Sequence, residues 1–322
     1  MKYITDNNTK FLAQKNFSPN NNIKKKSTFN KILYISFEFI LISYFFLIIK
    51  KNKIKVCLCT LGKKENRYAR EFVEHYKKYG VDKIFIYDNN DIEDEKFEEV
   101  LSDYIETDLV EIRNYRGKST IQINILRDCY KKNYIIYDWF IMVDMDEFIF
   151  LKDFKNIKSY LKGKRFMKCN LIHLNWVFHT DNNQIYYKNK SLFERFPNYK
   201  PKLIKIKSIL RGHIINIKIN SIHGINKKDN FTDFKYHYFD HFYCKSTEEF
   251  IEKLNRGDAY FVMNKKLKFK KIQFYFTDNQ ITIEKIRLFE KKTGIKMDYF
   301  KNIISKKEND KKNEFKKKIN MK

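Results

Sequence analysis

Residues 140–150, with the sequence FIMVDMDEFIF, place the three carboxylates Asp144, Asp146 and Glu147 inside an apolar segment. Four apolar residues precede Asp144, and three more follow Glu147. A continuous apolar run rich in β-branched and aromatic side chains is typical of a strand that is covered on both faces. A carboxylate that leaves water is costly unless it is paired or binds a metal. We therefore expect the three acids to lie where this strand leaves its sheet.

Strand and helix patterns alternate on the amino-terminal side of this stretch. Strands are predicted at 54–60, 83–89, 109–115 and 139–145. Helical patterns separate them at 65–80, 97–105 and 119–133, with Tyr68, Phe72, Val73 and Tyr76 on one face of the first. This alternation predicts an α/β fold in which a mostly parallel central sheet is flanked by helices.

Polar residues stand at the carboxyl ends of the predicted strands, where parallel sheets bind their ligands. These residues are Thr60, Asp88, Asn89, Asn90, Asp144 and Asp146. Two residues apart on a strand, Asp144 and Asp146 are predicted to point to the same face and to bind Mg²⁺ or Mn²⁺ through oxygen. The alternative is an acidic turn that caps the next helix. Because like charges repel, Asp146→Asn is expected to leave the ligand-free protein equally or more stable.

The chain is strongly basic, with 66 Lys and Arg against 39 Asp and Glu and a formal charge of +27. Residues 1–31 hold seven lysines and one acid, and residues 301–322 hold nine lysines and three acids, so each end contributes +6 and about +15 remains on the body. Such a body favours anionic partners such as nucleotide phosphates or lipid head groups. The sequence has neither zinc-finger spacing nor an RNA-recognition signature, so we expect no nucleic acid partner.

Residues 32–49, ILYISFEFILISYFFLII, are apolar apart from Glu38 and are long enough to cross a bilayer. We expect a retained single-pass anchor rather than a cleaved signal peptide, because no small-residue cleavage site follows. Lysines flank both sides, so orientation stays open. The expected location is a membrane: the Golgi or ER in a eukaryote, or the inner membrane with a cytoplasmic catalytic domain in a bacterium. The five cysteines are expected to be mostly buried thiols, with Cys57 and Cys59 on one strand face.

Four ordered blocks between about residues 54 and 260 resemble the family 2-like and family 92 glycosyltransferases. The blocks are TLGKKENRYAREFVEHYKKYGVDKIFIYDNND, YDWFIMVDMDEFIF, LNWVFHTDNNQIYYKNKSLFERF and HFYCKSTEEFIEKLNRGDA. The resemblance implies a GT-A fold and transfer of a sugar from a nucleotide diphosphate sugar, with inversion and a divalent metal. It also implies that Asp144 and Asp146 form the D-x-D and that Asp88 meets the base or ribose. Asp144 is expected to contact either the ribose or a metal-bound water. The resemblance places the nucleotide at Thr60, Lys63, Glu65, Asn66 and Arg67, although LGKKENRY departs from the usual form of the first block.

The later half of the chain must supply a base for the acceptor hydroxyl. Asp181, which we expect to be exposed in a turn, and Glu194 are the candidates, although Asp181 also suits an ordinary turn and Glu194 an ion pair. His241 is the preferred late histidine for the metal, ahead of His223, and it precedes a helix that begins with a Ser246–Glu249 capping box and ends at Gly257. Trp176 and Phe178 suit either sugar stacking or core packing.

These features predict a membrane-anchored, metal-dependent inverting glycosyltransferase of the hexosyltransferase type, with a glycan, lipid or protein acceptor. The expected segments are a basic tail at 1–31, the anchor at 32–49, a catalytic domain at 50–296 and a mobile Lys- and Asn-rich tail at 297–322. Two alternatives share the D-x-D. They are another phosphate-handling enzyme such as a nucleotidyltransferase, and a non-catalytic protein that binds sugar nucleotides.

Overall fold

A computed structural model of the chain describes residues 53–118, 122–215, 219, 230–257 and 263–320. It divides into two units, Met1–Lys53 and Ile54–Lys322. The first unit lies almost wholly outside the described residues, and with it the predicted anchor at 32–49 and the basic tail at 1–31. Within the described ranges, the helices are too short or too polar to cross a membrane. The features below belong to the second unit.

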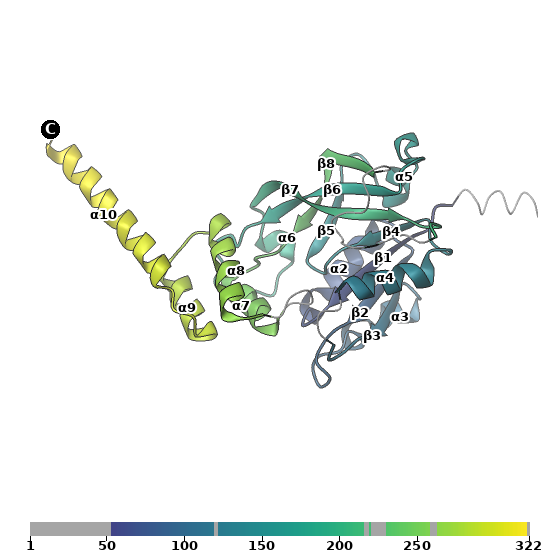
Figure 1. Ribbon diagram of the computed structural model, residues 1–322, viewed down its shortest axis with the longest axis horizontal. Coiled ribbons are helices and arrows are strands. Elements are labelled where there is room, and N and C mark those ends of the chain that lie inside the picture. Colours follow the sequence, from purple (N-terminus) through teal and green to yellow (C-terminus); the bar gives the residue numbers. More distant parts are fainter. Residues whose placement is uncertain (1–52, 119–121, 216–218, 220–229, 258–262, 321–322) are drawn as a thin grey trace, which may run out of the picture. The chain divides into compact units, whose positions relative to one another are not determined.

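The second unit is built on an eight-stranded mixed sheet with the order β3-β2-β1-β4-β7-β6-β8-β5 (Figure 1). The first half contains β1 (Val56–Gly62), β2 (Lys83–Asp88), β3 (Val110–Asn114) and β4 (Trp139–Met142). Within this half, each pair of adjacent strands is parallel. This half confirms the four predicted parallel strands.

The second half contains β5 (Glu147–Leu151), β6 (Leu171–His179), β7 (Tyr199–Arg211) and β8 (Asn230–His241). Its pairs β4–β7, β7–β6 and β8–β5 are antiparallel, while β6–β8 is parallel. The sheet as a whole is therefore mixed, with parallel pairs in the majority.

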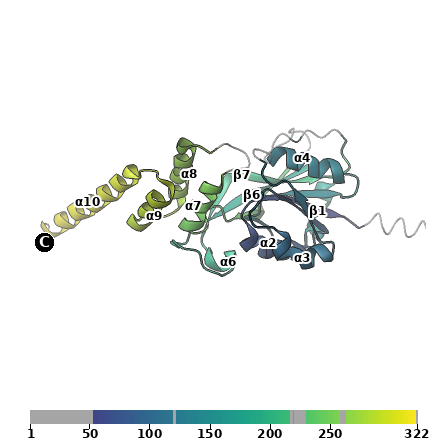
Figure 2. The ribbon, with the colours of Figure 1, turned by 90° about the horizontal axis from the view of Figure 1, so that it is seen from below.

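Helices cover both faces of the parallel half. Figure 2 shows α2 (Asn66–Lys78) and α3 (Glu98–Glu106) on one face and α4 (Gln122–Asn133) on the other. The apolar residues predicted for the first helix, Tyr68, Phe72, Val73 and Tyr76, are all buried against the sheet. Short helices α5 (Ile157–Leu161) and α6 (Leu192–Arg195) and the 3₁₀ turn Lys164–Phe166 lie in the connections.

A further apolar core joins the carboxyl-terminal helices, which are α7 (Thr247–Arg256), α8 (Lys265–Asp278), α9 (Ile283–Thr293) and α10 (Asp298–Asn320). The predicted capping box of Ser246 and Glu249 begins α7, and Gly257 ends it. Within the tail at 297–322, for which mobility stays a prediction, residues 298–320 form α10 (Figure 1). Met297 and Phe300 anchor this helix in the core.

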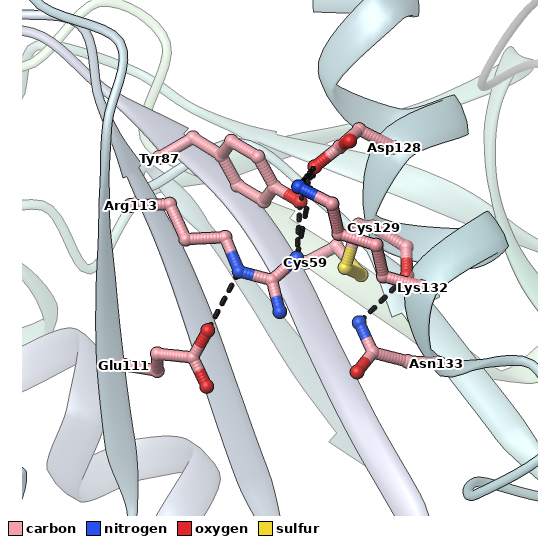
Figure 3. Close-up of a disulfide and its surroundings, with 8 residues drawn as sticks. All are labelled: Cys59, Tyr87, Glu111, Arg113, Asp128, Cys129, Lys132 and Asn133. Carbon is pink, nitrogen blue, oxygen red and sulfur yellow. Dashed lines mark hydrogen bonds and ion pairs between the residues drawn. A yellow bond between two sulfur atoms is a disulfide. The ribbon is translucent and has the colours of Figure 1, made fainter.

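Cys57 and Cys59 do lie on one sheet face, in the core beneath α4. The expectation of thiols is wrong for two cysteines, because Cys59 and Cys129 form a disulfide that joins β1 to α4 (Figure 3). Around it, Tyr87 donates a hydrogen bond to Asp128, and Arg113 lies between Tyr87 and Glu111. The sequence offers no spacing signal for the pair, since 70 residues separate the two cysteines.

Candidate active site

The acidic stretch forms a turn between β4 and β5. Because β4 ends at Met142, the strand period does not reach Asp144 and Asp146, and the prediction that they share a face on a strand is wrong. The backbone N–H of Glu147 donates to the carbonyl of Asp144 at 3.1 Å, which closes the turn. The two aspartates therefore meet different surroundings: the side chain of Asp144 is 34% exposed, and that of Asp146 is buried.

Asp146, Glu147 and His241 come together at the sheet edge. The antiparallel register of β5 and β8 pairs Glu147 directly with His241, and the turn brings Asp146 beside them. His241 Nε2 lies 3.5 Å from Asp146 Oδ1, and His241 Nδ1 lies 3.9 Å from Glu147 Oε1. One ligand atom from each of the three residues falls within 4.8 Å of the others, and all three residues are buried.

This cluster fits a divalent cation. Among the described residues, Glu147 Oε1 and His241 Nδ1 are buried without a hydrogen-bond partner. Buried polar atoms are normally satisfied, so two orphaned acceptor-type atoms a few ångströms apart indicate a missing electropositive partner. Two carboxylates and an imidazole suit the divalent ions that accept oxygen and nitrogen ligands. The predicted ligands Asp146 and His241 lie in this cluster, and Glu147 takes the third place.

Asp144, the remaining predicted ligand, is engaged elsewhere. Its Oδ2 lies 2.7 Å from Lys207 Nζ, and its Oδ1 accepts a hydrogen bond from Gln122 Nε2 at 2.7 Å. Lys207 is completely buried and also lies 3.1 Å from Glu147 Oε2, so it bridges the first and third acids of the stretch. The geometry therefore separates Asp144 from the group that can hold a metal.

Burial and the neighbouring cations shift the pKa values of the two buried acids in opposite directions. Burial favours the neutral form of Asp146, but Lys253, 2.6 Å away on α7, and His241 outweigh it and hold the pKa of Asp146 well below its usual range. Burial raises the pKa of Glu147 well above its usual range, and Lys207 only partly offsets the effect. Burial also lowers the pKa of His241, which keeps its imidazole neutral and able to bind a metal.

The residues predicted to bind the nucleotide divide into two groups. Glu65 is buried and paired with Lys245 at 3.0 Å and with Arg256, which hold its pKa low despite burial. Thr60 is also buried, and its Oγ1 has no partner among the described residues, as is true of Asn66 Oδ1. Thr60 and Asn66 thus each offer an unused polar atom.

Lys63 and Arg67 instead form ion pairs near the surface, Lys63 with Asp91 at 2.8 Å and Arg67 with Glu252 at 3.0 Å. Asp88 is buried at the end of β2, where it accepts hydrogen bonds from Arg116 Nη1 at 2.6 Å and from the backbone of Asn90 at 2.9 Å. Its carboxylate is therefore fixed in place by an arginine that no sequence pattern singled out.

A cavity of about 450 Å³ opens beside α7. Its walls come from the start of α2, the segment from Tyr243 through α7, and α9. The lining residues that matter below are Arg67, Tyr68, Lys245, Lys253 and Arg256. The whole lining carries six cations and four glutamates, which are Glu95, Glu248, Glu249 and Glu252, so positive charge is in excess. The cavity reaches the acidic turn through Lys253.

The two predicted base candidates lie outside this arrangement. Asp181 is 1% exposed, so the expectation of an exposed turn residue is wrong; its carboxylate pairs with Lys285 and accepts a hydrogen bond from Tyr275. Glu194 is the acidic member of a capping box with Ser191 at the start of α6. Its neighbour Arg195 pairs with Glu249 rather than with Glu194. Both acids therefore have structural partners in this state of the protein.

The aromatic candidates pack on the cluster. The ring centroids of Trp176 and Phe178 lie 4.6 and 4.8 Å from that of His241, and both side chains are largely buried. This favours the packing alternative and fixes the imidazole. His223 lies outside the described residues.

Sequence reasoning missed four cations at this site: Lys207, Lys245, Lys253 and Arg256. Lys207 had no usable signal, because residues 204–207, IKIK, alternate regularly and so favour an exposed lysine. Lys245, Lys253 and Arg256 had none, because lysine is common throughout the chain and their partners are far away in sequence.

Comparison with known proteins gives a family. The sequence model of glycosyltransferase family 92 matches residues 52–286, which is more than half of the chain. A glycosyltransferase family 92 protein of Ricinus communis is 26% identical over 110 residues, which cover 34% of this chain and 20% of the relative.

Among solved structures, S. aureus TarS residues 1–349 aligns with 62% of this chain and 63% of its own, at 11% identity and a TM-score of 0.36. The same protein in complex with UDP-GlcNAc aligns at 12% identity and a TM-score of 0.37, over 62% of this chain and 64% of its own. The chain thus spans a fifth of the curated relative and less than two thirds of these solved chains. Scores this low describe a remote likeness, so the family match carries the assignment.

Proposed function

This chain belongs to glycosyltransferase family 92, and from that premise we propose that it is a divalent-metal-dependent, inverting glycosyltransferase of the GT-A type. The donor is a nucleotide diphosphate sugar, and the acceptor is a hydroxyl of a glycan, lipid or protein. The observation that carries the proposal is the buried group of Asp146, Glu147 and His241 at the end of β4, with orphaned atoms on Glu147 and His241.

The residues around this group have separate roles. Asp146, Glu147 and His241 would hold Mn²⁺ or Mg²⁺, which supplies positive charge to the diphosphate as the anomeric bond breaks. Lys207 bridges Asp144 and Glu147 and holds both side chains in place. Asp88, held by Arg116, and the unused polar atom of Thr60 stand at the neighbouring strand ends, where the base and ribose would bind.

The test is turnover by the full-length chain in detergent. It is incubated with a panel of nucleotide sugars and Mn²⁺, and the released nucleoside diphosphate is measured against an EDTA control. We expect release with at least one donor that EDTA abolishes, and NMR of the product should show inverted anomeric configuration. Pyrophosphate release from nucleoside triphosphates would favour a nucleotidyltransferase. Binding without turnover toward any acceptor class would favour a non-catalytic protein.

We also propose that the catalytic domain is anchored by residues 32–49 and faces an oxidising compartment. The support is the apolar run itself and the Cys59–Cys129 disulfide, because disulfides persist where thiols are not kept reduced. For a eukaryotic chain this favours the lumen of the ER or Golgi. Full-length protein should resist carbonate extraction, and alkylation of denatured, unreduced protein should leave two of its five cysteines unlabelled. Carbonate release, or labelling of all five, would contradict this placement.

A further inference from the structure

We propose that Lys253 is an internal cation that occupies Asp146 while no donor is bound, and that it turns to the donor diphosphate when metal and donor enter. In the donor-free state Lys253 competes with the metal for Asp146. In the loaded state it becomes a ligand of the diphosphate. The inference rests on the proposed function and assigns a residue and an order of events within it.

Lys253 lies between Asp146 of the acidic turn and the cavity beside α7. Its Nζ lies 2.6 Å from Asp146 Oδ2, and it also lies over the ring of Tyr243, 4.4 Å from the centroid. The same side chain lines the cavity and is 24% exposed, whereas Asp146 is buried. A lysine with a flexible stem and one open side can change partners without unfolding its surroundings.

The helix that carries Lys253 is held firmly. Ser246 and Glu249 form its capping box, and Glu249 is also paired with the buried Arg195 and accepts a hydrogen bond from Tyr68. Lys253 follows Glu249 by four residues, so it lies one turn further along the same face. The backbone is therefore fixed, and movement is left to the lysine side chain.

The charges around the cavity call for an anion. Lys245, Lys253 and Arg256 provide three positive charges, and the carboxylates they contact, Glu65 and Asp146, provide two. Glu65 is already shared by Lys245 and Arg256, so it is not free to pair with Lys253 when a metal binds Asp146 and displaces that lysine. A buried cation without a counter-ion is costly. The diphosphate of the proposed donor has the charge that this surplus requires.

Two consequences follow for binding. Metal alone must displace Lys253 and leave it without a partner, so the metal should bind weakly. When a diphosphate is present, Lys253 has a new partner, so metal and nucleotide should strengthen each other's binding by the same factor. This exchange of partners favours ordered loading of metal and donor.

The test compares Lys253→Met and Lys253→Arg with the wild type in the full-length chain. Lys268→Met is the matched control, because Lys268 contacts the same helix through Asn255 and does not approach Asp146. Binding of Mn²⁺ alone is measured by the loss of the free-ion EPR signal. Binding of UDP and GDP at saturating Mn²⁺ is measured by calorimetry, using whichever the wild type binds.

Lys253→Met should bind Mn²⁺ alone at least about fivefold more tightly and the nucleoside diphosphate about tenfold more weakly. The loss of a merely structural ion pair would not shift the two affinities in opposite directions. Lys253→Arg keeps the charge and should bind Mn²⁺ no more tightly than the wild type. The control should change neither affinity.

Unchanged or weaker Mn²⁺ binding by Lys253→Met overturns the inference, as does unchanged nucleotide binding. If that variant fails to fold, tighter Mn²⁺ binding by Lys253→Arg overturns it instead. A wild-type chain that binds neither Mn²⁺ nor a nucleoside diphosphate overturns the proposed function itself.

Discussion

Asp146→Asn should destabilise the metal-free protein, and the loss should disappear when Lys253 is removed as well. The sequence alone suggests the opposite, because three neighbouring carboxylates ought to repel one another. The structure places two lysines among them, Lys207 against Asp144 and Glu147, and Lys253 against Asp146. Removing one carboxylate therefore leaves a cation unpaired instead of relieving a repulsion.

The size of the effect follows from the ion pair. At an effective dielectric constant of about 20, unit charges separated by the 2.6 Å between Asp146 and Lys253 attract by about 6 kcal/mol before desolvation. Breaking a buried pair by removing one partner costs roughly 3–5 kcal/mol. Because Lys253 is 24% exposed and can turn toward the cavity, we expect a loss of about 2–3 kcal/mol.

A double-mutant cycle measures this directly. Wild type, Asp146→Asn, Lys253→Met and the double variant are unfolded in urea with EDTA present, and free energies are extrapolated to water. The double variant should be more stable than the sum of the single losses predicts, by about 1–3 kcal/mol. Asp91→Asn is the control: its pair with Lys63 is exposed, so the change should stay within about 1 kcal/mol.

Additive losses, or an Asp146→Asn variant as stable as the wild type, would refute the coupling. The cycle would then show that the acidic stretch behaves as three independent charges.

Three shorter predictions concern the fold. Cys59→Ser should lower the free energy of unfolding by about 2–4 kcal/mol in urea titrations, and dithiothreitol should then have no further effect on the variant but should destabilise the wild type. Burial lowers the pKa of His75 to about 4, so the unfolded chain binds its proton first, and acidification from about pH 6.5 to 4 should cost the wild type about 2–3 kcal/mol that His75→Gln does not lose. Gly212→Ala should cost about 1–3 kcal/mol by thermal unfolding, because a Cβ at Gly212 would overlap the carbonyl oxygen of Tyr137; a variant as stable as the wild type would show that this turn can yield.

The parallel half of the sheet was predictable because its information is local. The first strand and helix follow from the apolar runs at 54–60 and from the spacing of Tyr68, Phe72, Val73 and Tyr76, and each lies where predicted within two residues. The position of the polar residues at the strand ends could be predicted from this topology. The contact between Asp146 and His241 was predicted only from the family resemblance.

The antiparallel half was harder because it depends on register between distant segments. Glu147 becomes a site residue only when β5 pairs with β8, which sets it opposite His241. In the sequence, Glu147 is simply the acid after the D-x-D. Asp181 was predicted to be exposed because it lies among turn-forming residues. It is buried because Lys285 and Tyr275, about a hundred residues later in the sequence, cover it.

Buried lysines mark the site more clearly than the total charge does. The overall charge of +27 in a Lys-rich chain says little, since a compositional bias would produce it and most lysines among the described residues are exposed. Lys207, Lys245 and Lys285 are different, because each is almost fully buried and each has a carboxylate partner. Burying an ammonium is costly enough that a compositional bias alone does not keep one there. Two of the three hold acids of the candidate site, since Lys207 pairs with Asp144 and Glu147 and Lys245 pairs with Glu65, so a buried lysine with a carboxylate partner marks this site in a chain where lysine is common.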